Sequence, residues 1–579
     1  MDTPNLLPLP RKLSLQSGYA TSKRTSRKAS ATPLPPEGYR LVITPRGTTV
    51  EATSEAGFFY ARQTLRQLDA QFPDARPCLT IEDWPVYPVR GFYHDVTRGK
   101  VPTLKTLCEL ADQCAHYKIN HLQLYIEHTY AFKKHPEVWQ GADPLTADEI
   151  RKLDDYCAAR HIDLVPSFST FGHFYTWIHH KFPELNELER DVSSDGECWW
   201  DRMAHYTLDC RNPKSIRLVG EIIREVKPLF RSRYFNICAD ETFDLGKGRN
   251  QAEAERVGVG RLYVDFLKAI MGHVQKAGAI PMFWGDVIGS HPEFLNEIPE
   301  DAVALDWDYS PKLSHSKARL MRESRRPFYV CPGIAGWNKW LPDYATSAKN
   351  IIRFARLGQQ EGAVGLLNTD WGDFGHIHTL GSSLPGMVLG ACASWSPGDH
   401  DYSAVQPILS RLVWGDRSGR LLSLLEKAVS ARRASWQIVA FAHEPRSLSM
   451  PSNWFDEKSG MPDGLTASVP AKHRRALEHI RKVEKQAKPL IRALPCRLLA
   501  EEISVGLLGL IAMEEYYLVC RAKALGTSCR VVKPAVAARH LRQLAKRLEA
   551  VWLRRNKRAE LDRILVVLEA AARQCLPTA

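Results

Sequence analysis

The spacing of hydrophobic positions divides this chain of 579 residues into regions with two different patterns. Between residues 88 and 373, short runs of Val, Ile, Leu and aromatic residues alternate with longer stretches in which apolar residues recur every three or four positions. The short runs predict buried strands, and the longer spacing predicts amphipathic helices. The predicted strands are Val89–Asp95, Ile119–His128, Ile162–Ser169, Tyr234–Glu241, Ile280–Val287, Ala302–Tyr309, Phe328–Trp337 and Ala363–Asp373. The predicted helices between them include Thr103–Tyr117, Ala147–Arg160, Pro213–Phe230, Gly260–Ala277 and Thr346–Leu357.

Eight predicted strands with intervening helices fit an α/β protein built on a (β/α)8 TIM barrel, which we place at residues 88–399. A doubly wound parallel sheet is the alternative. It is less favoured because the first strand-to-helix turn has no glycine-rich dinucleotide motif.

Three further regions flank the predicted barrel. Residues 1–36 are rich in Ser, Pro, Lys and Arg, a composition typical of a flexible tail. Residues 37–87 join alternating strand patterns to a helical pattern at Ala56–Leu68, which predicts a small N-terminal α/β module. Residues 400–579 predict a C-terminal helical domain. Its long helices are Arg474–Leu494, Cys496–Ala524, Pro534–Arg554 and Ala559–Gln574.

Composition and charge narrow the classes of partner. The net charge is +13, but no zinc-finger or RNA-binding motif accompanies the basic residues. We therefore interpret them as a solvated basic surface and expect no nucleic-acid partner. The 13 cysteines form no C-x-x-C pair, which argues against a disulfide framework and favours a reducing compartment. The first residues lack a signal-peptide pattern, and the longest apolar run, Val505–Met513, is too short to span a bilayer. A cytoplasmic protein without a membrane partner is the expectation.

Two adjacent carboxylates, Asp240 and Glu241, end the fourth predicted strand. Side chains of adjacent strand residues point in different directions, so this pair cannot easily flank one bond as the two acids of most glycosidases do. The two can instead divide the work between the scissile oxygen and another group of the substrate. Four tryptophans also end predicted strands, and such rings stack on the apolar faces of sugars. They are Trp284, Trp307, Trp337 and Trp371.

Several stretches together resemble glycoside hydrolase family 20, the β-N-acetylhexosaminidases, and in particular its hexosaminidase D-like branch. They lie in order and at barrel spacing over roughly residues 36–400. The stretches are Pro88–Asp95, Lys118–His128, Val165–His173, Asn236–Glu241, Phe283–Asp286 and Thr369–His376.

The resemblance implies an exo-acting enzyme that removes terminal β-linked GlcNAc or GalNAc from a glycan or glycoconjugate, with retention and without a metal or cofactor. The 2-acetamido oxygen of the substrate would act as the nucleophile, which is the substrate-assisted exception to the two-carboxylate scheme. Glu241 would be the general acid and base, with a raised pKa, while Asp240 stays ionised and orients the acetamido group.

The resemblance also implies roles for residues at other strand ends. His173 and Glu127 would form a relay that tunes Glu241, and Arg90 would bind ring hydroxyls through its planar fork of donors. Trp371 would wall the acetamido pocket and Asp373 would bind the 4- or 6-hydroxyl, while Trp284 and Trp307 would form further walls.

Two departures from the family pattern leave alternatives open. The common His-x-Gly-Gly-Asp-Glu motif reads Asn236-Ile-Cys-Ala-Asp-Glu241 here. The tyrosine that usually holds the acetamido oxygen is missing at the seventh strand, and Tyr309 or Trp337 is a candidate to replace it. A related exo-glycosidase of different sugar specificity and a non-catalytic sugar-binding barrel are the competing functions. A homodimer through the C-terminal helices is an open alternative for assembly.

Overall fold

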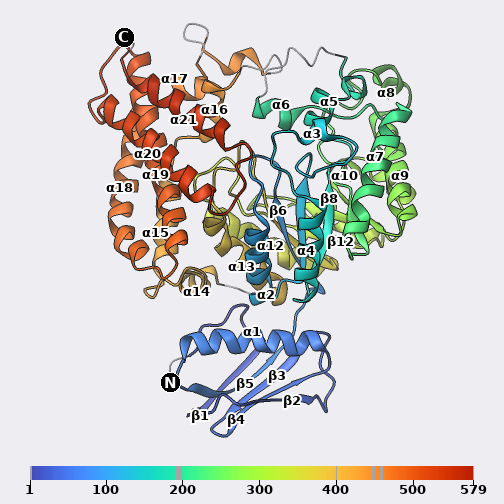
Figure 1. Ribbon diagram of the computed structural model, residues 1–579, viewed down its shortest axis with the longest axis vertical. Helices are drawn as coiled ribbons and strands as arrows, with labels where there is room; N and C mark the ends of the chain where they lie inside the picture. The colour runs from blue at the N-terminus through green and yellow to red at the C-terminus, as the bar shows by residue number, and fades with distance from the viewer. Residues whose placement is uncertain (1–2, 190–197, 399–400, 446–449, 457–460, 578–579) are drawn as a thin grey trace.

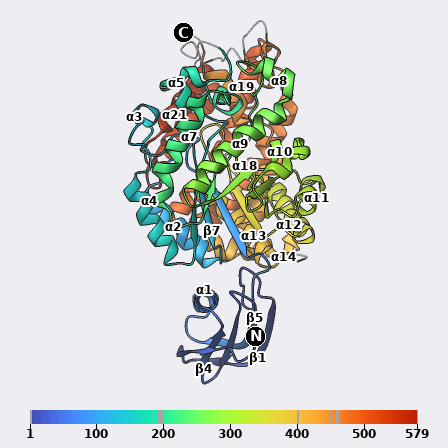
Figure 2. The ribbon, with the colours of Figure 1, turned by 90° about the vertical axis from the view of Figure 1, so that its right-hand side faces the viewer.

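The computed structural model describes residues 3–189, 198–398, 401–445, 450–456 and 461–577, and the protein has three parts (Figure 1). A small sheet module stands at one end of a closed barrel, and a block of long helices packs along one side of the barrel. Figure 2 shows helices α7 (Pro213–Val226) and α9 (Val259–Lys276) on the near side of the barrel, with the sheet module below.

The N-terminal module is a five-stranded sheet with the order β1-β5-β3-β4-β2. Helix α1 (Glu55–Gln71) lies on the sheet face that is turned toward the barrel (Figure 1). The helix starts where the Ser54 side chain accepts a hydrogen bond from the N–H of Gly57. The strands are β1 (Lys12–Ala20), β2 (Thr25–Ala29), β3 (Tyr39–Thr44), β4 (Gly47–Ala52) and β5 (Arg76–Asp83).

The prediction of a flexible tail at residues 1–36 is wrong, because β1 and β2 lie within it. Strand β1 pairs antiparallel with β5, and β2 pairs parallel with β4, so the two form the edges of the sheet. Nearly all of their side chains are exposed. Backbone pairing therefore holds these strands, and their charged, polar side chains are those that keep sheet edges from further pairing.

The predicted TIM barrel is confirmed as a closed ring of eight parallel strands in the order β10-β11-β12-β13-β6-β7-β8-β9. A separate cluster of buried side chains, including Tyr93, Met282 and Leu305, fills the interior of the ring. The strands are β6 (Val89–Asp95), β7 (His121–Ile126), β8 (Asp163–Phe168), β9 (Tyr234–Asn236), β10 (Ile280–Trp284), β11 (Val303–Trp307), β12 (Phe328–Cys331) and β13 (Gly365–Asp370).

Several helices of the barrel begin at a residue whose side chain caps them. Thr103 caps α2, Asn212 caps α7 ahead of Pro213, and Thr146 forms a capping box with Glu149. Such caps fix where each strand-to-helix connection ends, and these connections carry the site. The other helices around the barrel are α2 (Leu104–His116), α4 (Ala147–Ala158), α11 (Ser316–Glu323), α12 (Tyr344–Glu361) and α13 (Leu380–Trp395). Short helices α3 (Pro136–Trp139), α5 (Tyr175–His180), α6 (Trp199–Ala204), α8 (Gln251–Val257) and α10 (Asp286–Ser290) lie in the connections.

The C-terminal part is built around the long helix α19 (Arg497–Ala524). By length and composition alone α19 could cross a membrane, yet 89% of its apolar window is buried inside the fold. Its buried Glu514 and Glu515 bond to side chains of neighbouring helices, as expected for a core helix. The other helices are α14 (Tyr402–Trp414), α15 (Leu421–Ala431), α16 (Trp436–His443), α17 (Asp463–Thr466), α18 (Pro470–Arg492), α20 (Pro534–Trp552) and α21 (Leu561–Cys575).

Candidate active site

A pocket of about 200 Å³ opens at the carboxyl ends of the barrel strands, the end at which barrel enzymes hold their active sites. Two residues outside the predicted set, Arg98 and Met203, also line it. Sequence-predicted residues form the rest of the lining, and these are Asp240, Glu241, Trp307, Tyr309, Trp337, Trp371 and Asp373.

The turn after β9 sets the directions of Asp240 and Glu241. The predicted strand reached Glu241, but the observed strand ends at Asn236, and the backbone becomes left-handed at Cys238 (φ 57°), Ala239 (φ 63°) and Glu241 (φ 48°). Each left-handed residue with a Cβ costs about 1–2 kcal/mol, and such strain persists only where the surroundings hold it. The Gly-Gly of the family motif thus corresponds here to two residues in the conformation that glycine adopts most readily.

Two side chains hold this strained turn. Asn236, which stands in place of the motif's histidine, accepts a hydrogen bond from the N–H of Cys238 at 2.9 Å. Asp286, at the start of α10, accepts one from the N–H of Glu241 at 3.1 Å. Asp286 was not among the predicted site residues, although its position just after β10 is the signal that marks the others.

His173 lies against both carboxylates. Its Nε2 is 3.4 Å from Oε2 of Glu241 and 3.9 Å from Oδ2 of Asp240. The side chain of Glu241 is 28% exposed and that of Asp240 is 10% exposed, so Glu241 is the one that reaches toward the pocket opening. The charge of the imidazole therefore acts on both acids, and the titrations of Asp240 and Glu241 are coupled.

In the structure the order of the two pKa values is the reverse of the one that the family resemblance implies. Burial, reinforced by the charge of Glu241, raises the pKa of Asp240 to about 6. Burial also pushes the pKa of Glu241 upward, but the adjacent His173 ring, together with the charge of Arg98, outweighs it and leaves that pKa lowered. Burial and the charge of Asp240 raise the pKa of Asp286 to about 7. A proton shared among these acids therefore resides on Asp240 or Asp286, the more deeply buried carboxylates, rather than on Glu241.

The predicted binding role of Arg90 is wrong. Arg90 is the second residue of β6, so it lies at the amino end of the barrel, opposite the pocket. It is fully buried, bonds the carbonyl oxygens of Tyr87 and Lys118, and pairs with Glu37 at 2.7 Å. It joins the barrel to the N-terminal module.

Arg98 is the arginine that reaches the pocket. Its Nη1 donates to Oδ1 of Asp373 at 2.8 Å and its Nε donates to Oε1 of Glu127 at 3.2 Å. Its guanidinium lies 5.1 Å from the centre of the Trp371 ring. Its position in the sequence could have indicated this role. Arg98 lies three residues after Asp95, the last residue of β6, at the carboxyl end of the strand where barrel sites form.

Glu127 bonds Arg98 rather than His173. The relay predicted between Glu127 and His173 is therefore not a direct hydrogen bond, and the two residues influence each other through charge. Burial raises the pKa of Glu127, but Arg98 and Arg202 outweigh it and hold that pKa low, so Glu127 is an anion.

A chain of alternating charges continues from Glu127 into the C-terminal helical domain. Nη2 of Arg202, on α6, is 3.8 Å from Oε2 of Glu127, and its Nη1 donates to Oε1 of Glu560 at 2.6 Å. Glu560 directly precedes α21. The neighbouring Met203 lines the pocket, so α6 carries both the link and part of the wall.

Aromatic rings form the opposite wall. Trp307 and Tyr309 stack with centroids 5.2 Å apart, and Trp337 lies 5.1 Å from Tyr309. Nε1 of Trp371 donates to the Tyr309 hydroxyl at 2.6 Å. Trp284 is fully buried beneath Trp371, so it supports the wall rather than forming it as predicted.

Within the described residues, two groups of side chains lie close enough to hold a metal ion: His173 with Asp240 and Glu241, and Asp370 with His376 and His378. In the second group the two oxygens of Asp370 already accept hydrogen bonds from His378, His94 and Ser383. That carboxylate is satisfied by protein donors alone.

Comparison with known proteins gives matches on both sides of residue 85. Residues 87–331 match the family model described as glycosyl hydrolase family 20, catalytic domain, and residues 9–84 match glycosyl hydrolase family 20, domain 2. The chain is 29% identical to a β-hexosaminidase of Akkermansia muciniphila over 259 residues, which are 41% of this chain and 52% of that protein. It is 24% identical to β-hexosaminidase 1 of Coccidioides posadasii over 338 residues, which are 52% of this chain and 55% of that protein. The chain thus spans about half the length of these curated relatives.

Solved structures share the fold at low identity. A β-N-acetylhexosaminidase crystal structure aligns with a TM-score of 0.59 and 20% identity over 73% of this chain and 96% of that one. The chitobiase of Flavobacterium johnsoniae aligns with a TM-score of 0.60 and 16% identity over 95% of this chain and 99% of that one. Since the two family matches follow one another along the sheet module and most of the barrel, the chain belongs to glycoside hydrolase family 20.

Proposed function

We propose that the protein is an exo-acting β-N-acetylhexosaminidase that hydrolyses terminal β-linked GlcNAc or GalNAc by substrate-assisted catalysis. The observation that carries this proposal is the adjacent pair Asp240 and Glu241, held by a strained turn in a small pocket against His173. The pocket volume of about 200 Å³ is below the roughly 300–1,000 Å³ of sites for drug-sized ligands, which suits one terminal sugar.

In the proposed reaction the acetamido oxygen attacks the anomeric carbon, and the glycosidic oxygen leaves with a proton from Glu241. Water then attacks the same carbon, gives a proton back to Glu241, and breaks the bond to the acetamido oxygen. Two inversions give net retention. Asp240 accepts a hydrogen bond from the acetamido N–H and stabilises the positive charge that develops there.

Substrate binding would restore the proton order that this reaction needs. A sugar in the pocket excludes water from Glu241 and so disfavours its charged form. The acetamido N–H donates to Asp240 and favours its charged form. Because the two acids are coupled through His173, a proton can pass from the Asp240 side to Glu241 as the sugar enters.

We assign the acetamido oxygen to Tyr309 and the sugar hydroxyls to Asp373 with Arg98. The Tyr309 oxygen accepts from Trp371, and the hydroxyl proton of Tyr309, which also has Thr369 within reach, can turn toward a sugar in the pocket that Tyr309 shares with the acid pair. Asp373 is held at 2.8 Å by Arg98, and its side chain keeps 18% exposure toward the pocket. Trp337 and Trp371 then supply ring faces for the sugar.

Release of nitrophenol from aryl β-GlcNAc, β-GalNAc and β-galactoside tests the proposal. We expect the wild type to cleave an N-acetylhexosaminide, and Glu241→Gln to lose roughly 10²–10⁴-fold in kcat/KM, the usual contribution of a general acid. Asp240→Asn should lose activity on the N-acetyl substrates as well. No turnover of any substrate by the wild type would support a non-catalytic sugar-binding barrel. Galactoside turnover equal to that of the N-acetyl sugars would support an exo-glycosidase without acetamido assistance.

A further inference from the structure

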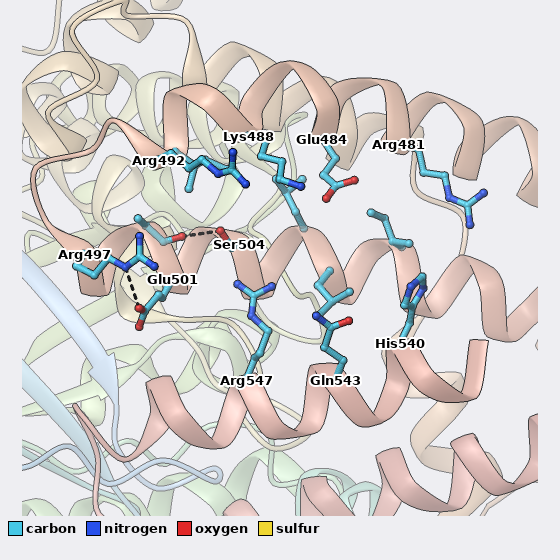
Figure 3. A pocket seen from close by; sticks show the side chains of 15 residues that line it. Arg481, Glu484, Lys488, Arg492, Arg497, Glu501, Ser504, His540, Gln543 and Arg547 are labelled. Atoms are coloured by element: carbon cyan, nitrogen blue, oxygen red, sulfur yellow. Dashed lines mark hydrogen bonds and ion pairs between the residues drawn. The ribbon is translucent and has the colours of Figure 1, made fainter. Parts of the chain in front are cut away.

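A basic groove lies in the C-terminal helical domain, formed by α18, α19 and α20 (Figure 3). It encloses about 530 Å³, and none of its lining residues belongs to the barrel pocket. In Figure 3 helix α19 forms the floor, while α18 and α20 lie along its two sides. It is therefore a second cavity, separate from the proposed active site.

The floor of the basic groove is a mostly apolar stripe on α19, in which Ala500, Leu507 and Ile511 are largely buried and present only their outer atoms to the groove. Ala500, Ser504, Leu507 and Ile511 recur at the spacing of one helix face, and Ile491 of α18 adds to it. From Ala500 to Ile511 the stripe is about 16 Å long, or three helical turns. No Trp, Tyr or Phe is among the described residues that line the groove. Because sugar sites rely on aromatic faces, this lining argues against a glycan ligand.

The walls of the basic groove carry a surplus of positive charge. Five Lys and Arg side chains and two glutamates line it. Arg481 is paired with Glu515 and Arg497 with Glu501. The remaining cations, Lys488, Arg492 and Arg547, have no ion pair or hydrogen bond with the described part of the chain, and they project from α18 and α20 toward α19 (Figure 3).

Arg547 is the most informative of the three cations. It is half-buried, and burial lowers its pKa despite Glu501 and Glu484 nearby. Holding a guanidinium partly out of water without a bonded partner is unfavourable, and a ligand carboxylate would relieve that cost. The long stems of Lys488 and Arg492 can cover apolar groups of the same ligand while their charged ends meet its anions.

We propose that the basic groove docks an acidic amphipathic helix of a partner protein. Aliphatic side chains of that helix pack on the α19 stripe, and its glutamates or aspartates pair with Lys488, Arg492 and Arg547. This is the helix-in-groove mode of recognition, with i, i+4, i+7 anchors matched to a floor of three turns. A second copy of this chain is a poor occupant because its net charge of +13 would bring like charges together.

The test uses two fluorescent peptides of about 18 residues and identical composition. One places Leu at i, i+4, i+7 and i+11 with Glu beside each, and the other has the same residues in shuffled order. Fluorescence anisotropy with the full chain should show binding of the amphipathic peptide at least tenfold tighter than binding of the shuffled one. The affinity should fall as salt is added, because exposed charge pairs are screened.

The variant Lys488→Glu/Arg492→Glu/Arg547→Glu should bind the amphipathic peptide at least tenfold more weakly. The matched control Lys482→Glu/Lys485→Glu/Lys546→Glu changes three exposed residues of the same two helices outside the groove and should leave the affinity within about twofold. Unchanged aryl-glycoside hydrolysis or, where no hydrolysis is seen, an unchanged melting temperature shows that the variants fold.

Equal binding of both peptides would mean general attraction of anions and would overturn the proposal. Binding of heparin or inorganic phosphate in the groove without binding of the amphipathic peptide would assign the groove to another class of ligand. The absence of any binding would also overturn it. None of these readouts depends on hydrolysis, so the result stands apart from that of the proposed enzyme activity.

Discussion

The barrel pocket and the basic groove are both lined by charged side chains, but they handle charge in opposite ways. In the barrel pocket Arg98 bonds both Glu127 and Asp373, and His173 lies against Asp240 and Glu241. In the basic groove Lys488, Arg492 and Arg547 face a cavity without such partners in the described chain. A site that performs chemistry needs its charges fixed before the substrate arrives, whereas a docking surface leaves charges free for its partner.

The largest test of this contrast compares two arginines. Arg98→Ala should cost about 3–5 kcal/mol of unfolding free energy, because it removes the cation that bonds two buried carboxylates, Glu127 and Asp373. Arg547→Ala should change stability by no more than about 0.5 kcal/mol. Urea unfolding of the two variants measures both values. Similar losses at the two positions would break the comparison.

The link between domains gives the next largest effect. Glu560→Gln removes the anion that accepts from Arg202, and we expect a loss of about 1.5–3 kcal/mol, the cost of a hydrogen bond to a charged group. If the protein is an active glycosidase, KM should rise as Arg202 draws Glu127 away from Arg98. Glu569→Gln on the same helix α21 breaks only the exposed pairs with Arg542 and Arg573 and should cost less than about 1 kcal/mol. Equal losses would mean that the buried ion pairs of Glu127, Arg202 and Glu560 contribute no more to stability than exposed ones.

The pH dependence of the unfolding free energy tests the burial of a charged group in the barrel pocket. The pKa of Asp240 is about 6 in the folded protein, above the ordinary value of about 3.9 in the unfolded chain. The folded state therefore binds more protons between these values, and stability falls as pH rises through this window. Asp240→Asn should be more stable than the wild type by about 1–3 kcal/mol at pH 7.5, with the difference shrinking at pH 4. A difference that is constant with pH would contradict the burial of this carboxylate.

The smallest expected effect concerns the strained turn. Ala239→Gly should raise the unfolding free energy by about 1 kcal/mol, because glycine adopts φ 63° without the Cβ clash. In the ordinary helix α20, Ala545→Gly should instead lower it by about 0.5–1 kcal/mol. Chemical unfolding of both variants gives the two signs. A loss at Ala239 would mean that the turn is relaxed and stores no strain.

The sequence predicted the barrel strands well because parallel barrel strands are buried on both faces and read as continuous apolar runs. It missed β1 and β2 because their side chains face water on an edge of the sheet, which gives a disordered-looking composition. Some strands were predicted to end too late: β9 ends at Asn236, whereas the prediction reached Glu241. The turn that ends it has positive φ values at Cys238 and Ala239, and such values leave no trace in the pattern of hydrophobic residues.

The candidate site was predicted in part for similar reasons. Residues just after strands, such as Asp240 and Trp371, were found because the barrel fixes where strand ends lie. Arg90 lies at the start of β6 and Arg98 just after its end, and only their position along this one strand tells them apart. The contact between Arg202 and Glu560 joins positions 358 residues apart, and local pattern carries no information about such a pair.

That contact has a consequence for how the protein can be taken apart. A fragment cut near residue 400 would keep every residue of the barrel pocket and still lose Glu560, leaving Arg202 beside Glu127 as a surplus positive charge. The barrel therefore depends on the C-terminal helical domain for the charge balance around its pocket. Any transplant of this site onto another scaffold, or any exchange of the helical domain between relatives, must carry an anion at the position of Glu560 to keep the electrical balance of the pocket.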